Sequence, residues 1–334
     1  MMNPQQLNRP TWEQLTGEQQ HLLFTQILRY FVNPLLPTTE IAPVRITVQG
    51  KNFASQTVMI AGQRYIFVPG QLQAQLGYQV TGQEVLTPQL WDDGSAVLEH
   101  PDLPAMALTT NGQRERYLTE FTTAPRTADI PPLLVAQQPL PIDQRSVGLY
   151  TPGTDDFSGD VVTFKKIRQN VGSQLRQAPR AIVTPEMSIY FVPTAVLGEY
   201  QLRVAEALPP MVLTQTLARQ GFSVLAPDEY EYVVSGGQTT LFPWGAQGLT
   251  DLPPVIPNRF GIRFSARQYT AEMTTDPLTW RGGWPVSGGQ KKVEAQLPFS
   301  AFYDSGRLPG FGDLPLPQQV YHQVIRVSFD DDDR

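Results

Sequence analysis

Three aspartates lie close together in one acidic segment and offer the oxygen ligands that hard cations prefer. Asp155, Asp156 and Asp160 stand within the stretch from Thr154 to Asp160. Carboxylates spaced along a loop can wrap a Ca²⁺ ion. A solvated acidic turn is the favoured interpretation of this segment, so we predict no cofactor and keep a structural divalent cation such as calcium as the alternative.

The residue types that serve most metal and nucleophilic chemistry are scarce. The chain has three histidines, His21, His100 and His322, and they show no close metal-binding spacing. It has no cysteine, which excludes disulfides, Cys-ligated zinc, iron–sulfur clusters and cysteine nucleophiles. No glycine-rich phosphate loop, GxSxG elbow or Ser/His/Asp set is recognisable. Whether the protein is an enzyme stays open, and a non-enzyme is favoured.

Two glutamates alternate with two tyrosines in the segment Glu229-Tyr230-Glu231-Tyr232. In an extended segment the two carboxylates would share one side and the two rings the other, because strand side chains alternate. Paired carboxylates could work as a general acid and base. A structural role in ion pairs is the favoured interpretation.

Composition bounds the class of protein. The 334 residues are 41% hydrophobic and 17% charged, with 31 Pro and 26 Gly, which favours a globular chain rich in turns and loops. A net charge of −6 argues against a nucleic-acid partner. No apolar run is long enough to span a membrane, and the first residues lack a basic region followed by an apolar core. We therefore expect a cytoplasmic location, or a particle assembled in the cytoplasm.

The first part of the chain predicts one helix followed by strands. Thr11 is the expected N-cap of a helix that runs to Phe31, with a break at Asn33-Pro34. A strand is expected at residues 44–48, and a hairpin at 57–60 and 64–68 around Ala61-Gly62-Gln63.

The middle and end of the chain predict loops, short helices and a last strand. Proline-rich residues 88–160 favour long ordered loops. Helices are expected at 164–175, 195–207 and 211–220, and residues 320–329 are expected to form the last strand.

Several motifs in the last third of the chain follow one another in a recognisable order. Residues 223–237 end in Gly236-Gly237 and are followed by Phe242-Pro243-Trp244-Gly245, Asn258-Arg259-Phe260-Gly261 and Arg281-Gly282-Gly283-Trp284. This order resembles the signature of the formylglycine-generating enzyme family, also called sulfatase-modifying factors. The resemblance spans about residues 55 to 330 and is strongest from 223 to 284. The residues identical to the family pattern are Glu229, Glu231, Tyr232, Gly236, Gly237, Pro243, Trp244 and Gly245.

The resemblance implies an irregular, coil-rich α+β fold of the C-type-lectin-like kind with an N-terminal helix. It implies a helical appendage and linker over residues 1–50 and a family-type domain over 51–334. It also implies a short helix at Glu229–Tyr232, with a glutamate paired to a buried arginine, for which Arg281 is the candidate. Independently of the resemblance, Gly282 and Gly283 would let the backbone approach closely, and Phe242 and Trp244 would bury apolar area in a tight turn.

Departures from the family pattern point away from its chemistry. Members that oxidise a sulfatase cysteine use two cysteines of their own near the C-terminus, and this chain has none. We therefore expect a non-catalytic protein that binds a protein, peptide or small-molecule ligand. The expected contact surface is the late aromatic set, since aromatic side chains give much contact area at low entropy cost. That set is Tyr269, Trp280, Trp284, Phe302 and Tyr303.

Two alternatives to this function stay open. One is a metal-dependent enzyme of altered chemistry that uses histidines and carboxylates. The other is a structural or display subunit of a phage or cell-surface assembly. The oligomeric state is not predicted.

Overall fold

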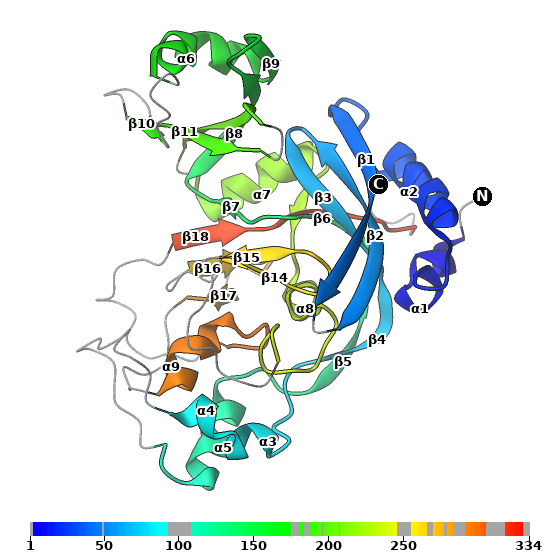
Figure 1. Ribbon diagram of the computed structural model, residues 1–334, viewed down its shortest axis with the longest axis vertical. Coiled ribbons are helices and arrows are strands. Elements are labelled where there is room, and N and C mark those ends of the chain that lie inside the picture. Colours follow the sequence, from blue (N-terminus) through cyan, green and yellow to red (C-terminus); the bar gives the residue numbers. More distant parts are fainter. Residues whose placement is uncertain are drawn as a thin grey trace.

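The computed structural model is a mixed α+β architecture of several small sheets and short helices (Figure 1). It describes residues 3–48, 50–92, 108–174, 181–183, 188–194, 197–206, 208–245, 255–265, 270–276, 279–283, 291–304 and 318–329. The α+β class expected from the sequence is confirmed. No helix in these ranges is both long and apolar enough to cross a membrane.

The N-terminal helix starts later than the sequence predicts. A 3-10 turn η1 (Pro4–Leu7) and a one-turn helix α1 (Arg9–Trp12) come first, followed by α2 (Gly17–Phe31). Thr16, not Thr11, is the N-cap of α2, because its hydroxyl accepts from Gln19 N while the Gln19 side chain accepts from Thr16 N. The predicted end at Phe31 is confirmed.

A six-stranded sheet forms the central body, and α2 packs against its outer side (Figure 1). Its order is β1-β2-β3-β6-β19-β13. The strands are β1 (Thr38–Val48), β2 (Lys51–Ile60), β3 (Gln63–Val68), β6 (Leu133–Ala136), β19 (Gln323–Arg326) and β13 (Ser223–Val224). Because β1 pairs with β2 along its length, the predicted domain boundary at residue 50 falls in the turn of one hairpin.

The predicted β2–β3 hairpin is confirmed. Ile60 pairs with Gln63, which leaves Ala61 and Gly62 as a two-residue loop. Both have positive φ, 48° and 78°, as a turn that follows the right-handed strand twist requires.

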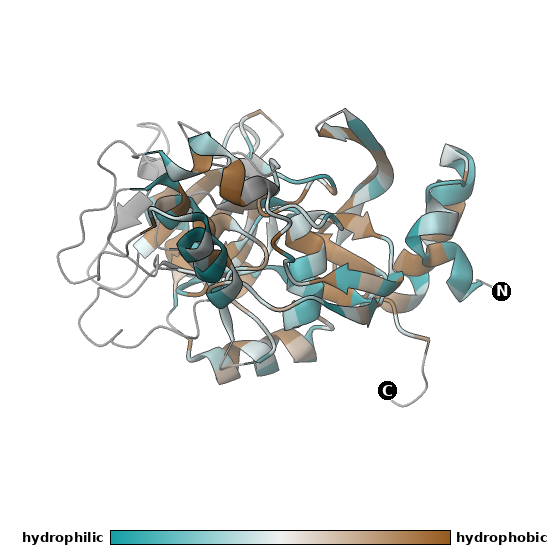
Figure 2. Ribbon diagram, turned by 90° about the horizontal axis from the view of Figure 1, so that it is seen from below, coloured by the Kyte–Doolittle hydropathy of each residue, from teal (hydrophilic) through white to brown (hydrophobic). Residues whose placement is uncertain are grey.

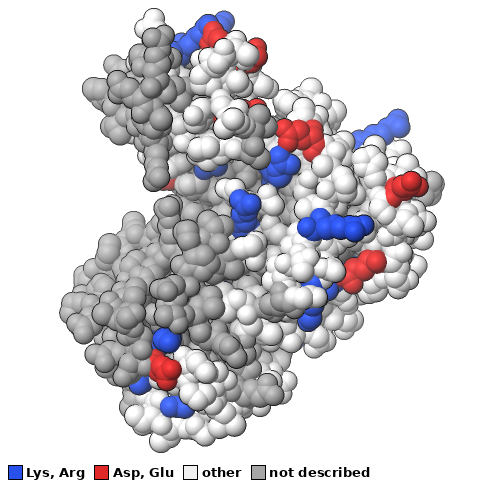
Figure 3. Space-filling model, viewed as in Figure 1, with Lys and Arg blue, Asp and Glu red and all other residues white. Residues whose placement is uncertain are grey.

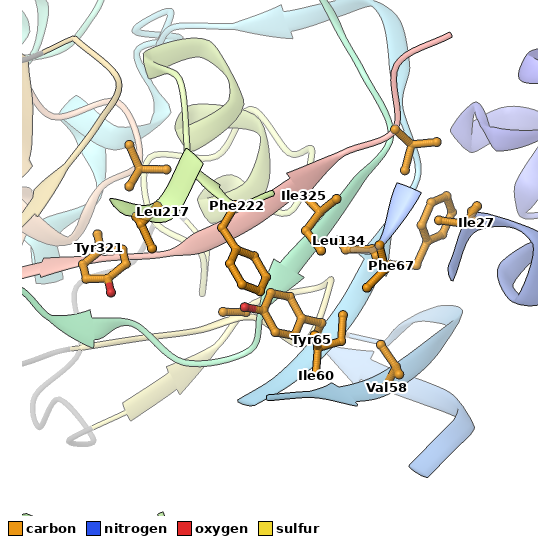
Figure 4. Packing of buried hydrophobic residues seen from close by; sticks show 14 of the residues in the cluster. Ile27, Val58, Ile60, Tyr65, Phe67, Leu134, Leu217, Phe222, Tyr321 and Ile325 are labelled. Atoms are coloured by element: carbon orange, nitrogen blue, oxygen red, sulfur yellow. The ribbon is translucent and has the colours of Figure 1, made fainter. Parts of the chain in front are cut away.

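Alternating side chains of the sheet divide the core into two clusters. Tyr65 and Phe67 face the cluster that includes Ile27 of α2, whereas Ile66 and Val68 face the opposite cluster. Figure 4 shows the first cluster, in which the rings of Tyr65 and Phe222 stack with centroids 5.9 Å apart. The N-terminal helix is therefore part of the main core.

A second lobe is built on a five-stranded sheet covered by α6 (Figure 1). The order is β10-β11-β12-β8-β9. The elements are β8 (Gln144–Thr151), β9 (Asp156–Gly159), α6 (Val161–Gln174), β10 (Ala181–Val183), β11 (Ser188–Pro193) and β12 (Tyr200–Ala205). The predicted helix at 195–207 is thus wrong, because β12 pairs with β8 on one side and β11 on the other and buries Leu202 and Val204.

The region predicted to be long loops also holds regular structure. Residues 88–160 contain α4 (Pro88–Trp91), α5 (Asn111–Glu120), β5 (Arg126–Ile130), β7 (Leu140–Pro141) and the strands β6, β8 and β9 given above. Pro131 and Pro132 lie between β5 and β6, so they interrupt neither strand. The prediction of long loops is therefore wrong for residues 88–92 and 108–160, the parts of this region that the structure describes.

The remaining elements complete the body around the central sheet. They are β4 (Gln71–Leu76), α3 (Gln83–Leu86), α7 (Pro210–Arg219), α8 (Pro227–Ser235), β14 (Val255–Pro257), β15 (Arg263–Ser265), β16 (Thr270–Met273), β17 (Trp280–Gly282), α9 (Lys292–Gln296), η3 (Leu297–Phe299) and β18 (Gln318–Tyr321). The predicted helix at 211–220 is confirmed as α7. The predicted strand at 320–329 breaks at His322, where the chain passes from a four-stranded sheet (β18) to the central sheet (β19). Figure 2 shows apolar residues concentrated on the inner strands.

Asp160 caps α6, so we expect acid to destabilise this helix of the second lobe. Its carboxylate accepts from the Thr163 hydroxyl (2.6 Å) and backbone N–H (3.0 Å), and these bonds lower its pKa below the usual 3.8. A carboxyl with a lowered pKa stabilises the folded state above pH 3.8, and that stabilisation is lost as the pH falls through the folded-state pKa. We predict that Asp160→Ala costs about 1 kcal/mol at pH 7, so that amides of residues 161–174 exchange about fivefold faster.

The same exchange measurement, corrected for the intrinsic pH dependence of the rates, should show a smaller difference at pH 3. Asp156→Ala is the matched control, because this exposed neighbour starts β9 and caps no helix. An equal effect of the two substitutions at pH 7 would contradict the capping role.

Candidate functional site

The signature helix α8 carries a fully buried carboxylate that binds two arginines. Glu231 has no exposed surface, and its Oε1 accepts from Arg281 Nη2 (3.0 Å) and Arg126 Nη2 (2.9 Å). Its Oε2 accepts from the backbone N–H of Gly77 (2.9 Å). The expected pairing of a glutamate with Arg281 is therefore present, and α8 is the short helix that the resemblance implies.

The neighbouring glutamate is engaged in a separate ion pair. Glu229 accepts two hydrogen bonds of 2.6 Å from Arg326 of β19 and one of 2.7 Å from the N–H of Ala226. Such two-pronged contacts fix both side chains. Since Glu231 and Glu229 are each held by arginines that they do not share, the two do not form a free acid and base couple.

The other signature residues pack the same region. Tyr232 donates to the carbonyl of Pro69 (3.1 Å), and burial raises the pKa of its phenol to about 12. The half-buried Trp244 stacks on Phe242, with centroids 4.8 Å apart, in the turn that Gly245 closes. Gly282 has φ 73°, and a Cβ there would lie 2.6 Å from the carbonyl oxygen of Thr270. A side chain would therefore clash with β16, while Gly283 after it is buried.

The expected aromatic contact surface is not assembled in the described residues. Phe302 and Tyr303 are fully buried in a third core cluster with Leu297 and Phe242. Trp280 is half-buried and packs against the first core cluster. Tyr269 and Trp284 lie outside the described residues. Phe302 and Tyr303 thus serve packing, and they offer no surface to a partner.

Two of the three aspartates in the acidic segment, Asp155 and Asp160, form hydrogen bonds and ion pairs with nearby residues. Asp155 accepts from the Tyr150 hydroxyl (2.9 Å) and pairs with Arg168, and these contacts lower its pKa. Asp160 caps α6 and pairs with Arg145 (3.1 Å), while Asp156 is exposed. Across the ranges given above, no three His, Asp or Glu side chains stand close enough to hold a metal ion.

The histidines do not converge on a shared point within the described chain. His21 is on the exposed face of α2, near Gln56 (3.4 Å), and His100 lies outside the described residues. His322 is fully buried, with Nδ1 2.5 Å from Glu272 Oε1 and Nε2 3.2 Å from the carbonyl oxygen of Arg263. Both ring nitrogens therefore face oxygen atoms of the protein itself.

A small cavity lies beside this buried pair. Tyr230, Thr270, Glu272 and Arg281 contribute to its wall, and its volume is about 20 Å³. The Nε of Arg281 and the hydroxyl of Thr270 are buried without a hydrogen-bond partner. This volume fits one water molecule and no larger ligand. Sequence reasoning missed the pairing of Glu272 in β16 with His322, which lies 50 residues later between β18 and β19.

A larger cavity lies where the second lobe meets the central sheet. Its volume is about 330 Å³, within the range of small-molecule sites. Strands β11 and β12 form one side of this cavity, and the β2–β3 turn and the segment after β6 form the other. Figure 3 shows basic side chains where the two lobes meet. Its charged lining residues are Glu40, Arg64, Glu199, Arg203 and Arg263.

Arg203 is the unusual group of this cavity. Only 7% of the residue is exposed, and its guanidinium donates two hydrogen bonds, of 2.6 and 3.0 Å, to the neutral amide oxygen of Gln201. No carboxylate among the described residues pairs with it, whereas Arg64 pairs with Glu40 (2.7 Å). Burial lowers the pKa of Arg203 to about 10, so it remains a cation at pH 7. A buried charge without a counter-ion is costly and marks a candidate site.

Gln201 fixes the position of Arg203 across the lobe junction. Its Nε2 donates to the carbonyl of Gly62 (3.3 Å), at the turn of the β2–β3 hairpin. Sequence reasoning missed this site because it assigned residues 195–207 to a helix. The inward-facing pair Gln201 and Arg203 on a strand was the signal available, since residues two apart share a strand face.

The buried ion pair of Glu231 gives a direct test of the scaffold. We predict that Glu231→Gln lowers the free energy of unfolding by about 3–5 kcal/mol, because it leaves the 4%-exposed Arg281 without its counter-ion. Urea unfolding followed by circular dichroism measures the loss.

The matched control is Asp228→Asn, which removes the other carboxylate bound to Arg126. The Asp228 side chain is 44% exposed, so this change should cost less than about 1 kcal/mol. Similar losses in the two variants would show that burial does not set the strength of this network.

Neither a protein-family model, nor a curated protein, nor a solved structure matches this chain. The formylglycine-generating enzyme family therefore remains a resemblance of motifs.

Proposed function

We propose that this protein is a non-catalytic binding protein and that its ligand is a small hydroxylated monocarboxylate, of the sugar-acid type, held in the Arg203 cavity. The observation that supports this most is the buried guanidinium of Arg203 without a carboxylate partner in the described chain. An anionic ligand would supply the missing counter-ion. A carboxylate can accept two parallel hydrogen bonds from a guanidinium.

The charge balance of the cavity supports a ligand with a single negative charge. Three arginines and two glutamates line it, which leaves an excess of one positive charge. Glu40 forms an ion pair with Arg64, and Glu199 accepts a hydrogen bond from the Thr194 hydroxyl (2.7 Å). Arg203 and Arg263 are then the cations left for a ligand.

The rest of the lining supports a hydroxylated ligand. Four glutamines contribute amide donors and acceptors, and few apolar side chains take part. Amides that present both donors and acceptors suit sugar hydroxyls. The glutamines are Gln63, Gln137, Gln138 and Gln201.

The family-like scaffold is part of the same proposal. A formylglycine-generating-enzyme-like body that lacks the family's cysteines could retain binding and lose the oxidation chemistry. The buried Glu231–Arg281 pair and the motif order support such a body. The binding surface we propose is the lobe junction, rather than the loops around Trp280 and Trp284.

Substitution of Arg203 should affect ligand binding and thermal stability differently. We predict that Arg203→Met weakens the binding of D-glucuronate at least about thirtyfold, since removing one partner of a buried charge pair costs 2–5 kcal/mol. The same change should leave the melting temperature unchanged or higher, because it removes a buried charge that lacks a counter-ion. Isothermal titration calorimetry and thermal unfolding measure the two effects.

Two controls define the result. Glucose, which lacks the carboxylate, should bind the unmodified protein far more weakly than glucuronate. Arg145→Met removes an arginine of β8 that does not line the cavity and should leave binding unchanged. If the unmodified protein shows no heat with glucuronate, or if Arg203→Met binds it equally well, the proposal is wrong.

A further inference from the structure

A second cavity lies on a different part of the body, between the N-terminal turn and the signature helix. Its volume is about 380 Å³. It is lined by α1, the first residue of β2, strand β4, the segment that follows α8, and the turn at residue 259. None of its lining residues is shared with the Arg203 cavity.

Three cations and no carboxylate line this second cavity. They are Arg9, Lys51 and Arg259, which come from three separate segments. Glu13 lies next to the cavity and contacts two of them, with Oε1 2.9 Å from Arg9 Nε and 3.8 Å from Arg259 Nη2. One carboxylate therefore serves two guanidiniums, and together with Lys51 the cluster carries an excess of two positive charges.

The two guanidiniums are held by the fold despite their repulsion. Arg9 lies over the ring of Phe260 (5.4 Å to the centroid) and donates to the carbonyl of Gly237 (3.3 Å). Arg259 packs its backbone and Cβ closely against Gly236, and its Nε is buried without a hydrogen-bond partner. Burial, followed by the charge of Arg9, lowers the pKa of Arg259. Arg259 therefore shares the distant carboxylate of Glu13 with Arg9 and keeps one donor that the described chain does not satisfy.

We propose that this second cavity binds a doubly charged tetrahedral oxyanion, either free phosphate or the phosphate group of a monoester. Two guanidiniums and an ammonium in the lining of one cavity match its charge. Neutral polar side chains beside them can donate to the remaining oxygens. They are Gln73, Gln75, Gln238, Thr239 and Thr240.

Calorimetric titration of the full chain with inorganic phosphate at pH 8, in low salt, tests the proposal. We expect saturable binding that Arg259→Gln weakens at least tenfold. Glu13→Gln should instead strengthen it severalfold, because the competing carboxylate is removed. A general charge effect would instead be equal for Arg259→Gln and for the loss of an arginine outside the cavity.

Further experiments distinguish free phosphate from a phosphate monoester and control for misfolding of a variant. Glycerol 3-phosphate binding more tightly than inorganic phosphate assigns the site to a monoester, and the reverse order assigns it to the free ion. Arg219→Gln removes an exposed arginine of α7 outside the cavity and should have no effect. Lys51→Gln, on an exposed side chain, repeats the test if Arg259→Gln does not fold.

Absence of saturable binding, or an equal loss in Arg259→Gln and Arg219→Gln, would overturn the proposal. Arg203→Met should leave phosphate binding intact, so failure at this cavity is distinguishable from failure at the lobe junction.

Discussion

The carboxylate of Glu231 is the interaction on which the rest of the body depends. It carries a charge with no exposed surface, and such a charge is tolerated only when it is paired and hydrogen-bonded. Its partners come from β17 (Arg281), β5 (Arg126) and the residue after β4 (Gly77). One side chain of α8 therefore holds together segments that lie 50 to 154 residues away from it in the chain.

Helix α8 is also linked, through the central sheet, to the lobe junction that holds the Arg203 cavity. Helix α8 packs its apolar side in the second core cluster, and Glu229 ties it to β19 of the central sheet through Arg326. The central sheet carries the β2–β3 turn, to which Gln201 of the second lobe is bonded through Gly62. The cavity of Arg203 is thus formed between a rigid sheet and a lobe joined to it, an arrangement typical of ligand sites between domains.

Local patterns predicted local structure well and distant pairing less well. The β2–β3 hairpin and α7 could be predicted because their signals lie within a few neighbouring residues. The strand Tyr200–Ala205 could not, since its sequence is also compatible with a helix and its state is decided by pairing with β8 and β11. Burial of Phe302 and Tyr303 likewise depends on contacts with distant elements. The motif order correctly identified Arg281 as a partner of a glutamate, whereas the unpaired charge of Arg203 is visible only in the folded protein.

The most direct measurement is a crystal structure of the unmodified protein soaked with D-glucuronate. The account predicts electron density for the sugar acid at the lobe junction, with its carboxylate in two hydrogen bonds to the Arg203 guanidinium and its hydroxyls on the surrounding glutamines. Density for water alone in that cavity at saturating ligand, or a carboxylate of another residue in contact with Arg203, would contradict it.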